Sequence, residues 1–370
     1  MGAMRRLIPF TIFMVALTAC GNDLVTDSAA QVAAPDSAQS RVNRTDVVTS
    51  VSTIPPGVPD LSISIVDVND VHFDTFDGGS VPLGEASEGQ VLDLLDQIPP
   101  IDNPPYIDPA EDEWLEDDDI ILGYIDAEGQ AYAYPHKILN FHEIVNDTLA
   151  DVPVLVSYCP LCNSGVVFDR RIDDLRQEGE LTFGNSSALF DNDLVMVDRQ
   201  TNTYWWQVPG RGIVGSLSGA ELTVLPSVTT TWSQWLIDEP DTLLISRDLG
   251  FRRDYTRDPF AGYSDRVNQG ITPFPVEDGV FDDVRLAPAA QVIAIEVGSE
   301  AVAIPIDQLT EDFELSIGGV DHVIVPDGGG GARAFTISDD GQQVPTASRS
   351  TFWFAYFASF PDARVVRPPR

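Results

Sequence analysis

The sequence predicts a β-rich α+β fold, with internally duplicated sheet units packed as one compact body and an abbreviated second copy. Two observations lead to this prediction. Short apolar runs broken by Gly, Pro and Asp recur along the chain, whereas few segments have a helical period. In addition, three blocks of sequence recur later in the same order, as internal duplication requires.

The expected elements alternate mainly between strands and turns. The strand-like runs lie at residues 120–125, 131–134, 152–158, 165–170, 194–198 and 213–217. Helical segments are expected at 136–146 and 233–237, where the apolar spacing changes. This pattern is typical of a fold in which helices are a minor part.

The two predicted copies span about 119–247 and about 290–370. Residues 123–139 align to 294–309, and the pair Trp232 and Trp235 aligns with Trp353 and Tyr356. The loop that carries two cysteines in copy one is replaced in copy two by a run of glycines. A feature needed by the scaffold would be expected in both copies, so the cysteine loop is predicted to be functional.

The N-terminus resembles a bacterial lipoprotein signal peptide over residues 1–19. Two arginines precede an apolar core, and Leu17-Thr18-Ala19-Cys20 resembles a lipobox in which Cys20 is lipidated. The alternatives are an ordinary cleaved signal and a short buried helix. Residues 20–60 are expected to be a flexible tether and 61–370 the folded body. The predicted location is therefore the cell envelope, extracytoplasmic and lipid-anchored, with the membrane as a partner through the lipid on Cys20.

The chain is strongly acidic, with 58 Asp and Glu residues against 21 Lys and Arg and a formal net charge of −37. Nucleic-acid binding requires a basic face, so no nucleic-acid partner is expected. The acidic surface is interpreted as a solvated surface suited to salty surroundings. Any protein or small-molecule partner stays unidentified at this level.

Cys159 and Cys162 form the single thiol pair that lipidation would leave, in the motif Cys-Pro-Leu-Cys after a strand-like run. With His142, and Glu143 as a fourth ligand or a supporting group, they could bind Zn or Cu, because thiolate and imidazole suit both ions. Alternatively they are a redox-active dithiol in which Cys159 attacks. A plain disulfide, within a non-catalytic binding module, is the third possibility. A thioredoxin-like fold is disfavoured, since a strand follows Cys162 directly.

A second dense region contains Asp198, Arg199 and Gln200. These side chains could orient a ligand or support groups around the site. Equally, they could form an Asp–Arg pair and a capped turn that brace a buried tryptophan. Both interpretations stay open here.

Several of these motifs together resemble the exported bacterial and archaeal family DUF3179, a domain of unknown function, over about 115–370. The motifs are Ala133–Pro135, His142–Asp147, Tyr158–Ser164, Asp198–Thr201 and Asp258–Phe260, in family order. The resemblance implies no established activity. Its members are often exported or lipid-anchored, which agrees with the N-terminus.

Overall fold

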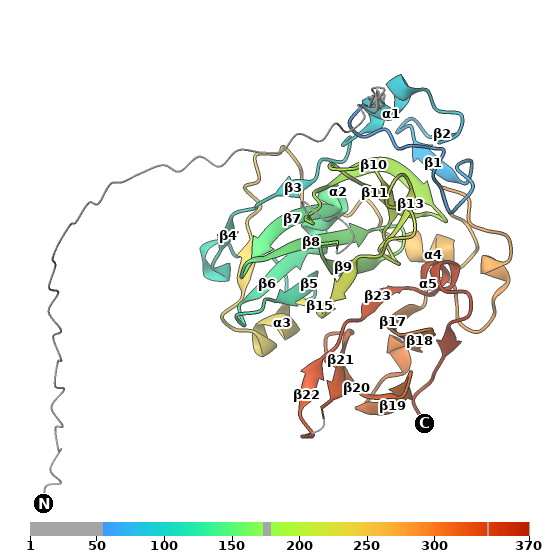
Figure 1. Ribbon diagram of the computed structural model, residues 1–370. Helices are drawn as coiled ribbons and strands as arrows, with labels where there is room; N and C mark the ends of the chain where they lie inside the picture. Colours follow the sequence, from blue (N-terminus) through green and yellow to red (C-terminus); the bar gives the residue numbers. More distant parts are fainter. Residues whose placement is uncertain (1–54, 173–178, 339, 370) are drawn as a thin grey trace, which may run out of the picture. The chain divides into compact units, whose positions relative to one another are not determined.

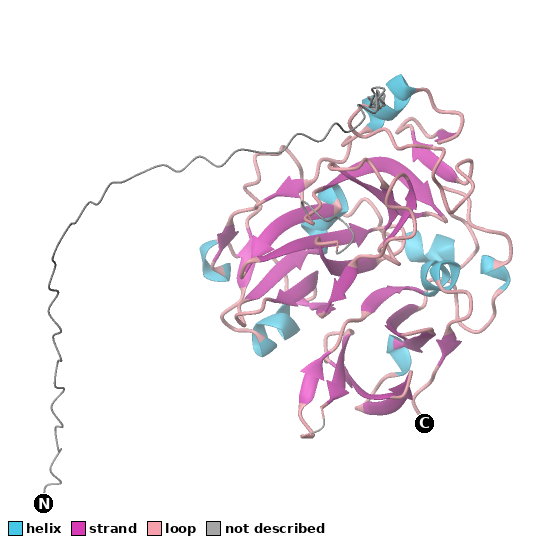
Figure 2. Ribbon diagram, viewed as in Figure 1, coloured by secondary structure: helices cyan, strands magenta, loops and turns pink. Residues whose placement is uncertain are grey.

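The computed structural model describes residues 55–172, 179–338 and 340–369. The predicted signal peptide, Cys20 and most of the predicted tether lie outside these residues. Strands make up 38% of the chain and helices 14%, which confirms the β-rich α+β prediction; strands dominate Figure 2. The strands form four sheets, and Thr53–Arg370 forms one compact unit.

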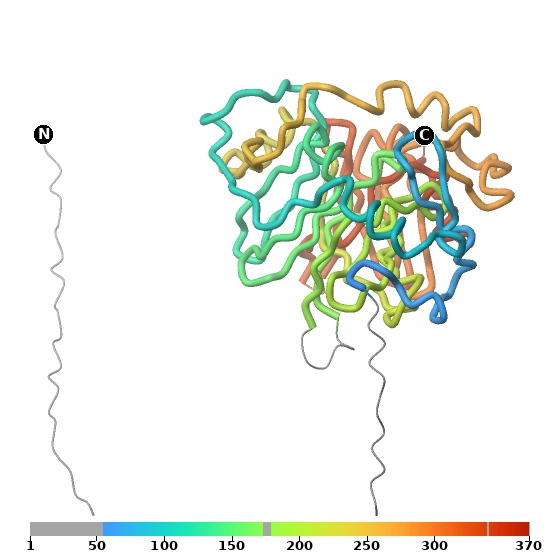
Figure 3. The backbone as a smooth tube through the Cα atoms, turned by 90° about the horizontal axis from the view of Figure 1, so that it is seen from above, coloured from blue at the N-terminus to red at the C-terminus, as the bar shows by residue number. Residues whose placement is uncertain are grey.

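The first sheet has the order β13-β12-β11-β10-β1-β2. The early strands β1 and β2 join it because β1 pairs antiparallel with β10. In Figures 1 and 3 these blue strands accordingly lie beside the yellow-green segment. Its strands are β1 Val71–Asp74, β2 Ser80–Pro82, β10 Phe183–Phe190, β11 Asp193–Asp198, β12 Tyr204–Trp206 and β13 Arg211–Val214.

The largest sheet has the order β24-β18-β17-β23-β9-β8-β7-β3, with β14 paired to β9. Strands β8 and β9 lie in its middle and are almost wholly buried, as their continuous apolar runs predict. The strands are β3 Ile101–Asp102, β7 Ile144–Leu149, β8 Val152–Cys159, β9 Ser164–Asp169, β14 Thr223–Leu225, β17 Gln291–Val297, β18 Glu300–Pro305, β23 Arg349–Phe352 and β24 Arg364–Val365.

Two smaller sheets complete the strands. One has the order β15-β5-β6-β16-β4, and the other is the consecutive meander β19-β20-β21-β22. Their strands are β4 Tyr106–Ile107, β5 Ile120–Ile125, β6 Ala131–Pro135, β15 Ser227–Thr231, β16 Leu243–Ile245, β19 Phe313–Ile317, β20 Val320–Pro326, β21 Ala332–Ile337 and β22 Gln343–Pro345.

The helices of the described residues are short. They are α1 Glu88–Leu94, α2 His136–His142, α3 Trp232–Asp238, α4 Tyr263–Val267 and α5 Trp353–Ser359, with 3-10 turns η1 Pro109–Glu111, η2 Val280–Asp282 and η3 Ile306–Gln308. No helix in this part of the chain is long and apolar enough to cross a membrane.

One predicted helix was too long. The sequence predicted helix over 136–146, but α2 ends at His142 and β7 begins at Ile144. Glu143 adopts a left-handed conformation, φ 59°, which stops the helix. The β-branched pair Ile144 and Val145 then enters a buried strand, where such side chains pack well.

The two predicted copies share one strand arrangement. In copy one, β15 pairs antiparallel with β5, β5 with β6, and β16 lies parallel to β6. In copy two, β23, β17, β18 and β24 take the same four places with the same directions. In each copy a helix, α3 or α5, precedes the parallel strand. The duplication itself stays a prediction.

The largest core cluster lies around the end of β8. It includes both cysteines together with Phe168, Trp205 and Phe354, which come from β9, β12 and α5. The cysteine loop is therefore packed between elements that are distant in sequence.

Candidate metal centre

The cysteines lie on the hairpin between β8 and β9. Cys159 is the last residue of β8 and pairs with Ser164, while Cys162 lies in the intervening turn. The Cys162 N–H donates to the Cys159 carbonyl at 3.2 Å, and Asn163 closes the turn with φ 44°. This tight turn brings both sulfurs close together.

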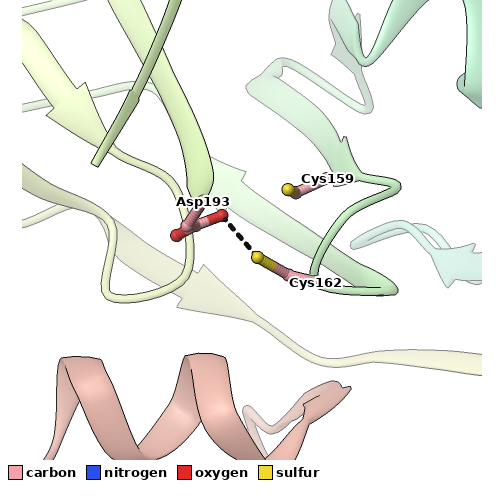
Figure 4. A group of neighbouring side chains, drawn as sticks. All are labelled: Cys159, Cys162 and Asp193. Carbon is pink, nitrogen blue, oxygen red and sulfur yellow. Dashed lines mark hydrogen bonds between the residues drawn. The ribbon is translucent and has the colours of Figure 1, made fainter. Parts of the chain in front are cut away.

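Asp193 completes a group of three potential metal ligands. Its side chain comes from the start of β11, and Figure 4 shows both cysteines extending toward it. The Cys162 thiol donates to Asp193 Oδ1 at 3.3 Å. Ligand atoms of Cys159, Cys162 and Asp193 all lie within 4.8 Å of one another. Both cysteines are free thiols in this structure.

The opposite oxygen of Asp193 is held by the backbone. The Val208 N–H donates to Oδ2 at 2.8 Å, so Oδ1 is left to face Cys162. The Cys162 thiol also approaches the Asn192 carbonyl at 3.5 Å. A carboxylate fixed in this way is preorganised to act as a ligand, since its rotamer is already set.

The group is buried and acidic. Cys159, Cys162 and Asp193 are each about 1% exposed or less. Burial raises the pKa of Asp193 to about 7, and it also raises the pKa values of both thiols. The negative charge of Asp193 raises the pKa values of the thiols as well. A bound cation would reverse these shifts, because thiolate and carboxylate ligands bind metals in their ionised forms.

Glu143 belongs to the same neighbourhood. As the left-handed residue that ends α2, it turns its side chain toward Asn185, whose amide donates to Oε2 at 2.7 Å. Burial, together with the nearby charge of Asp193, raises the pKa of Glu143 to about 8. Glu143 and Cys159 line one cavity. Asn185 was not singled out from the sequence, although it stands in the second dense region.

His142 is held by partners outside the group of potential ligands. Its Nδ1 is 2.8 Å from the Pro99 carbonyl and its Nε2 is 2.7 Å from the Tyr255 hydroxyl. Both ring nitrogens therefore have protein partners, and His142 is not part of the group formed by Cys159, Cys162 and Asp193. The group of potential ligands in the structure thus contains Asp193, which the sequence did not single out, and does not contain His142.

The residues Asp198, Arg199 and Gln200 brace a turn. The Asp198 carboxylate accepts from the Trp205 indole at 2.9 Å and from the Thr201 hydroxyl at 2.7 Å. Arg199 forms an ion pair with Asp96, and the Gln200 side chain accepts from the Thr182 N–H at 2.9 Å. These contacts correspond to the second interpretation of this region, a capped turn beside a buried tryptophan.

Comparison with known proteins identifies one family. A family model described as "Protein of unknown function (DUF3179)" matches residues 95–349 and so includes the cysteine hairpin and Asp193. No curated protein and no solved structure matches the chain.

Proposed function

The chain belongs to DUF3179, a protein family of unknown function, and we propose that it binds a metal ion through Cys159, Cys162 and Asp193. The observation that carries the proposal is the convergence of two thiols and one carboxylate within 4.8 Å in the core. Burying several acidic groups together is unfavourable unless a cation compensates them. Glu143 is the candidate for a fourth ligand or for a group that supports the ligands.

Zinc fits this donor set best, and copper remains the second ion to test. Zn²⁺ takes four ligands from thiolate, imidazole and carboxylate groups. Two sulfurs and one carboxylate oxygen would leave a fourth position, which catalytic zinc sites keep for water or substrate. Cu(I) favours thiolates but gains less from a carboxylate. The ligand in this fourth position determines whether the site is catalytic: water or substrate would make it so, and a protein side chain would make it structural.

Thiol–disulfide exchange is less favoured by the surroundings of the cysteines. A reactive cysteine is partly exposed and has a lowered pKa, because the thiolate is the nucleophile. Here both thiols are buried and their pKa values are raised. A metal is the simpler partner for such a pair.

We further propose that this domain works outside the cytoplasm on a lipid anchor at Cys20. The support is the signal-like N-terminus and the Leu17–Cys20 motif. The anchor and the metal centre are independent proposals, and each has its own test.

Elemental analysis of the full chain, purified without metal-affinity resin, tests the metal centre. We expect stoichiometric metal in the natural protein and its loss in Cys159→Ser and Asp193→Asn. Asp191→Asn is the matched control, because this buried carboxylate accepts from the Glu277 N–H and is not in the group. His142→Ala should lower stability but keep the metal.

Other outcomes separate the alternatives. Metal-free natural protein, or equal metal in all four variants, would contradict the proposal. A metal-free protein with a Cys159–Cys162 disulfide of mildly oxidising potential would favour thiol–disulfide exchange. A disulfide that resists reduction, and whose removal only lowers stability, would leave a structural staple.

A further inference from the structure

A cavity of about 320 Å³ adjoins the candidate metal centre, and both Cys159 and Glu143 line it. Small-molecule sites in proteins typically occupy roughly 300–1,000 Å³. The cavity is therefore large enough for a small organic molecule. A molecule bound there would lie against a metal ligand.

Much of the cavity wall is apolar. Leucine and phenylalanine side chains from five separate segments contribute to it, namely Leu161, Leu189, Leu194, Phe260 and Phe274. Displacing water from such a wall by an apolar ligand body is favourable. The occupant is thus expected to carry a hydrocarbon part.

Arg266 is the cationic side chain in this wall. Its guanidinium lies over the ring of Tyr263, another lining residue, with the Cζ atom 5.3 Å from the ring centroid. Stacking restricts the side chain while its N–H donors stay available. Among the described residues, Arg266 has no ion pair and no side-chain hydrogen bond.

Arg266 belongs to the minority of described arginines that have no acidic partner. The net charge of the protein is −37, and most arginines of the described ranges form ion pairs. Of these ranges, the arginines that have neither an ion pair nor a side-chain hydrogen bond are Arg252, Arg253, Arg257 and Arg266. Only Arg266 of these four lines this cavity. Its position suits an external anion.

The two carboxylates in the wall already have donors. Asp74 accepts from the Phe76 N–H at 2.7 Å, and Glu143 accepts from the Asn185 amide at 2.7 Å. Their hydrogen-bonding capacity is thus partly satisfied within the protein, whereas the exposed guanidinium of Arg266 has no acceptor among the described residues. The unmatched polar group in the cavity is a donor with positive charge.

We propose that this cavity binds a small organic acid, with its carboxylate on Arg266 and its hydrocarbon body against the apolar wall beside Cys159. A guanidinium binds a carboxylate through paired charge-assisted hydrogen bonds. This inference deepens the proposed metal-centre function. It rests on that function only in treating Cys159, which lies beside the bound acid, as a metal ligand. Binding of the acid by Arg266 and the apolar wall requires no metal.

Calorimetric titration with three eight-carbon probes tests the inference on the full chain. Octanoate, octanol and octylamine share one hydrocarbon body and differ in charge. We expect octanoate to bind about tenfold or more tightly than octanol, and octylamine more weakly than either. Tighter binding of octylamine would overturn the proposal, since it would assign the charge selection to Asp74 and Glu143.

Matched variants locate the site. Arg266→Gln should reduce octanoate affinity to that of octanol, while Arg257→Gln, which changes an unpaired arginine outside this wall, should leave it unchanged. Leu189→Trp should weaken octanoate and octanol alike by narrowing the cavity. Octanoate affinity that is unchanged in Arg266→Gln would overturn the proposal even if Leu189→Trp fails to fold.

Elemental analysis of the same samples distinguishes this inference from the metal proposal. Octanoate bound by a metal-free chain, with dependence on Arg266, would support the cavity and contradict the metal centre. A metal-loaded chain that does not bind octanoate would overturn the cavity alone.

Discussion

At the scale of single residues, burial determines which polar groups can take part in chemistry. Asp193 and Cys162 form a hydrogen bond in the core, whereas both ring nitrogens of His142 form hydrogen bonds with Pro99 and Tyr255. A histidine with two protein partners is held in place, and metal binding would cost it one of them. The side chains beside the cysteines, and not the nearest histidine in sequence, therefore define the candidate centre.

His136 is a buried histidine that should make stability depend on pH. Its side chain lies against Tyr158, with ring centroids 4.2 Å apart, and its Nε2 has no hydrogen-bond partner among the described residues. Burial lowers its pKa to about 3. The unfolded chain, with a histidine pKa of about 6.5, binds a proton at pH 5 that the folded protein does not.

The free energy of unfolding should consequently fall as the pH decreases below about 6.5. His136→Phe keeps an aromatic ring at this position and removes the titratable group. The variant should therefore retain about 2 kcal/mol of the free energy of unfolding that the natural protein loses between pH 7 and pH 5. Urea unfolding at both pH values measures this difference. Parallel losses in both proteins would show that His136 does not carry the effect.

At the scale of elements, a glycine in one sheet allows a tryptophan side chain to pack directly against the strand backbone. Gly123 on β5 faces the buried Trp235 of α3, and a Cβ there would lie 2.5 Å from the indole ring. The aligned residue of the second copy is Ala294, and Tyr356 takes the place of the tryptophan. Gly123 pairs with Ala133, and Ala294 with Ala303, which is the pairing that the sequence alignment implies.

Gly123→Ala should therefore destabilise the protein by about 1–3 kcal/mol through overpacking. Gly89→Ala is the control, because nothing lies within 4 Å of its added Cβ and alanine favours a helix. Thermal or urea unfolding of both variants checks the expectation. A Gly123→Ala protein as stable as the Gly89→Ala protein would contradict it.

At the scale of the whole molecule, the two predicted copies combine one arrangement of strands with different chemistry. The cysteine hairpin joins β8 and β9, whereas the aligned loop between β20 and β21 carries glycines. In that loop, Asp327 Oδ1 accepts the Gly329 and Gly331 N–H groups, each at 2.9 Å. The Asp327 side chain thus braces this turn in the predicted second copy, and the candidate centre belongs to the predicted first copy.

The proposed anchor predicts where the whole protein is found in the cell. Cys20→Ser should move it from the membrane fraction to the soluble extracytoplasmic fraction, because lipidation at Cys20 would be lost. Immunoblotting of cell fractions measures the shift, and Cys159→Ser is the control that should stay with the membrane. Equal membrane association of both variants would contradict lipidation at Cys20.

The sequence by itself determined the features that are local or periodic. Continuous apolar runs predicted β5 and β8, the Cys-Pro-Leu-Cys motif identified a thiol pair directly after a strand, and the motifs together identified the family. Each of these depends on residues that are neighbours in the chain. The extent of α2 was missed because a single left-handed residue, Glu143, ended the helix early.

Only the tertiary structure decided the membership of the candidate centre. Asp193 lies 31 residues beyond Cys162 and reaches it because β11 packs near the end of β8, while Tyr255, 113 residues beyond His142, binds that histidine. No periodicity in the sequence encodes how separate sheets face one another. Side-chain partners across such an interface follow from packing, and packing therefore selected Asp193 for the group and gave His142 other partners.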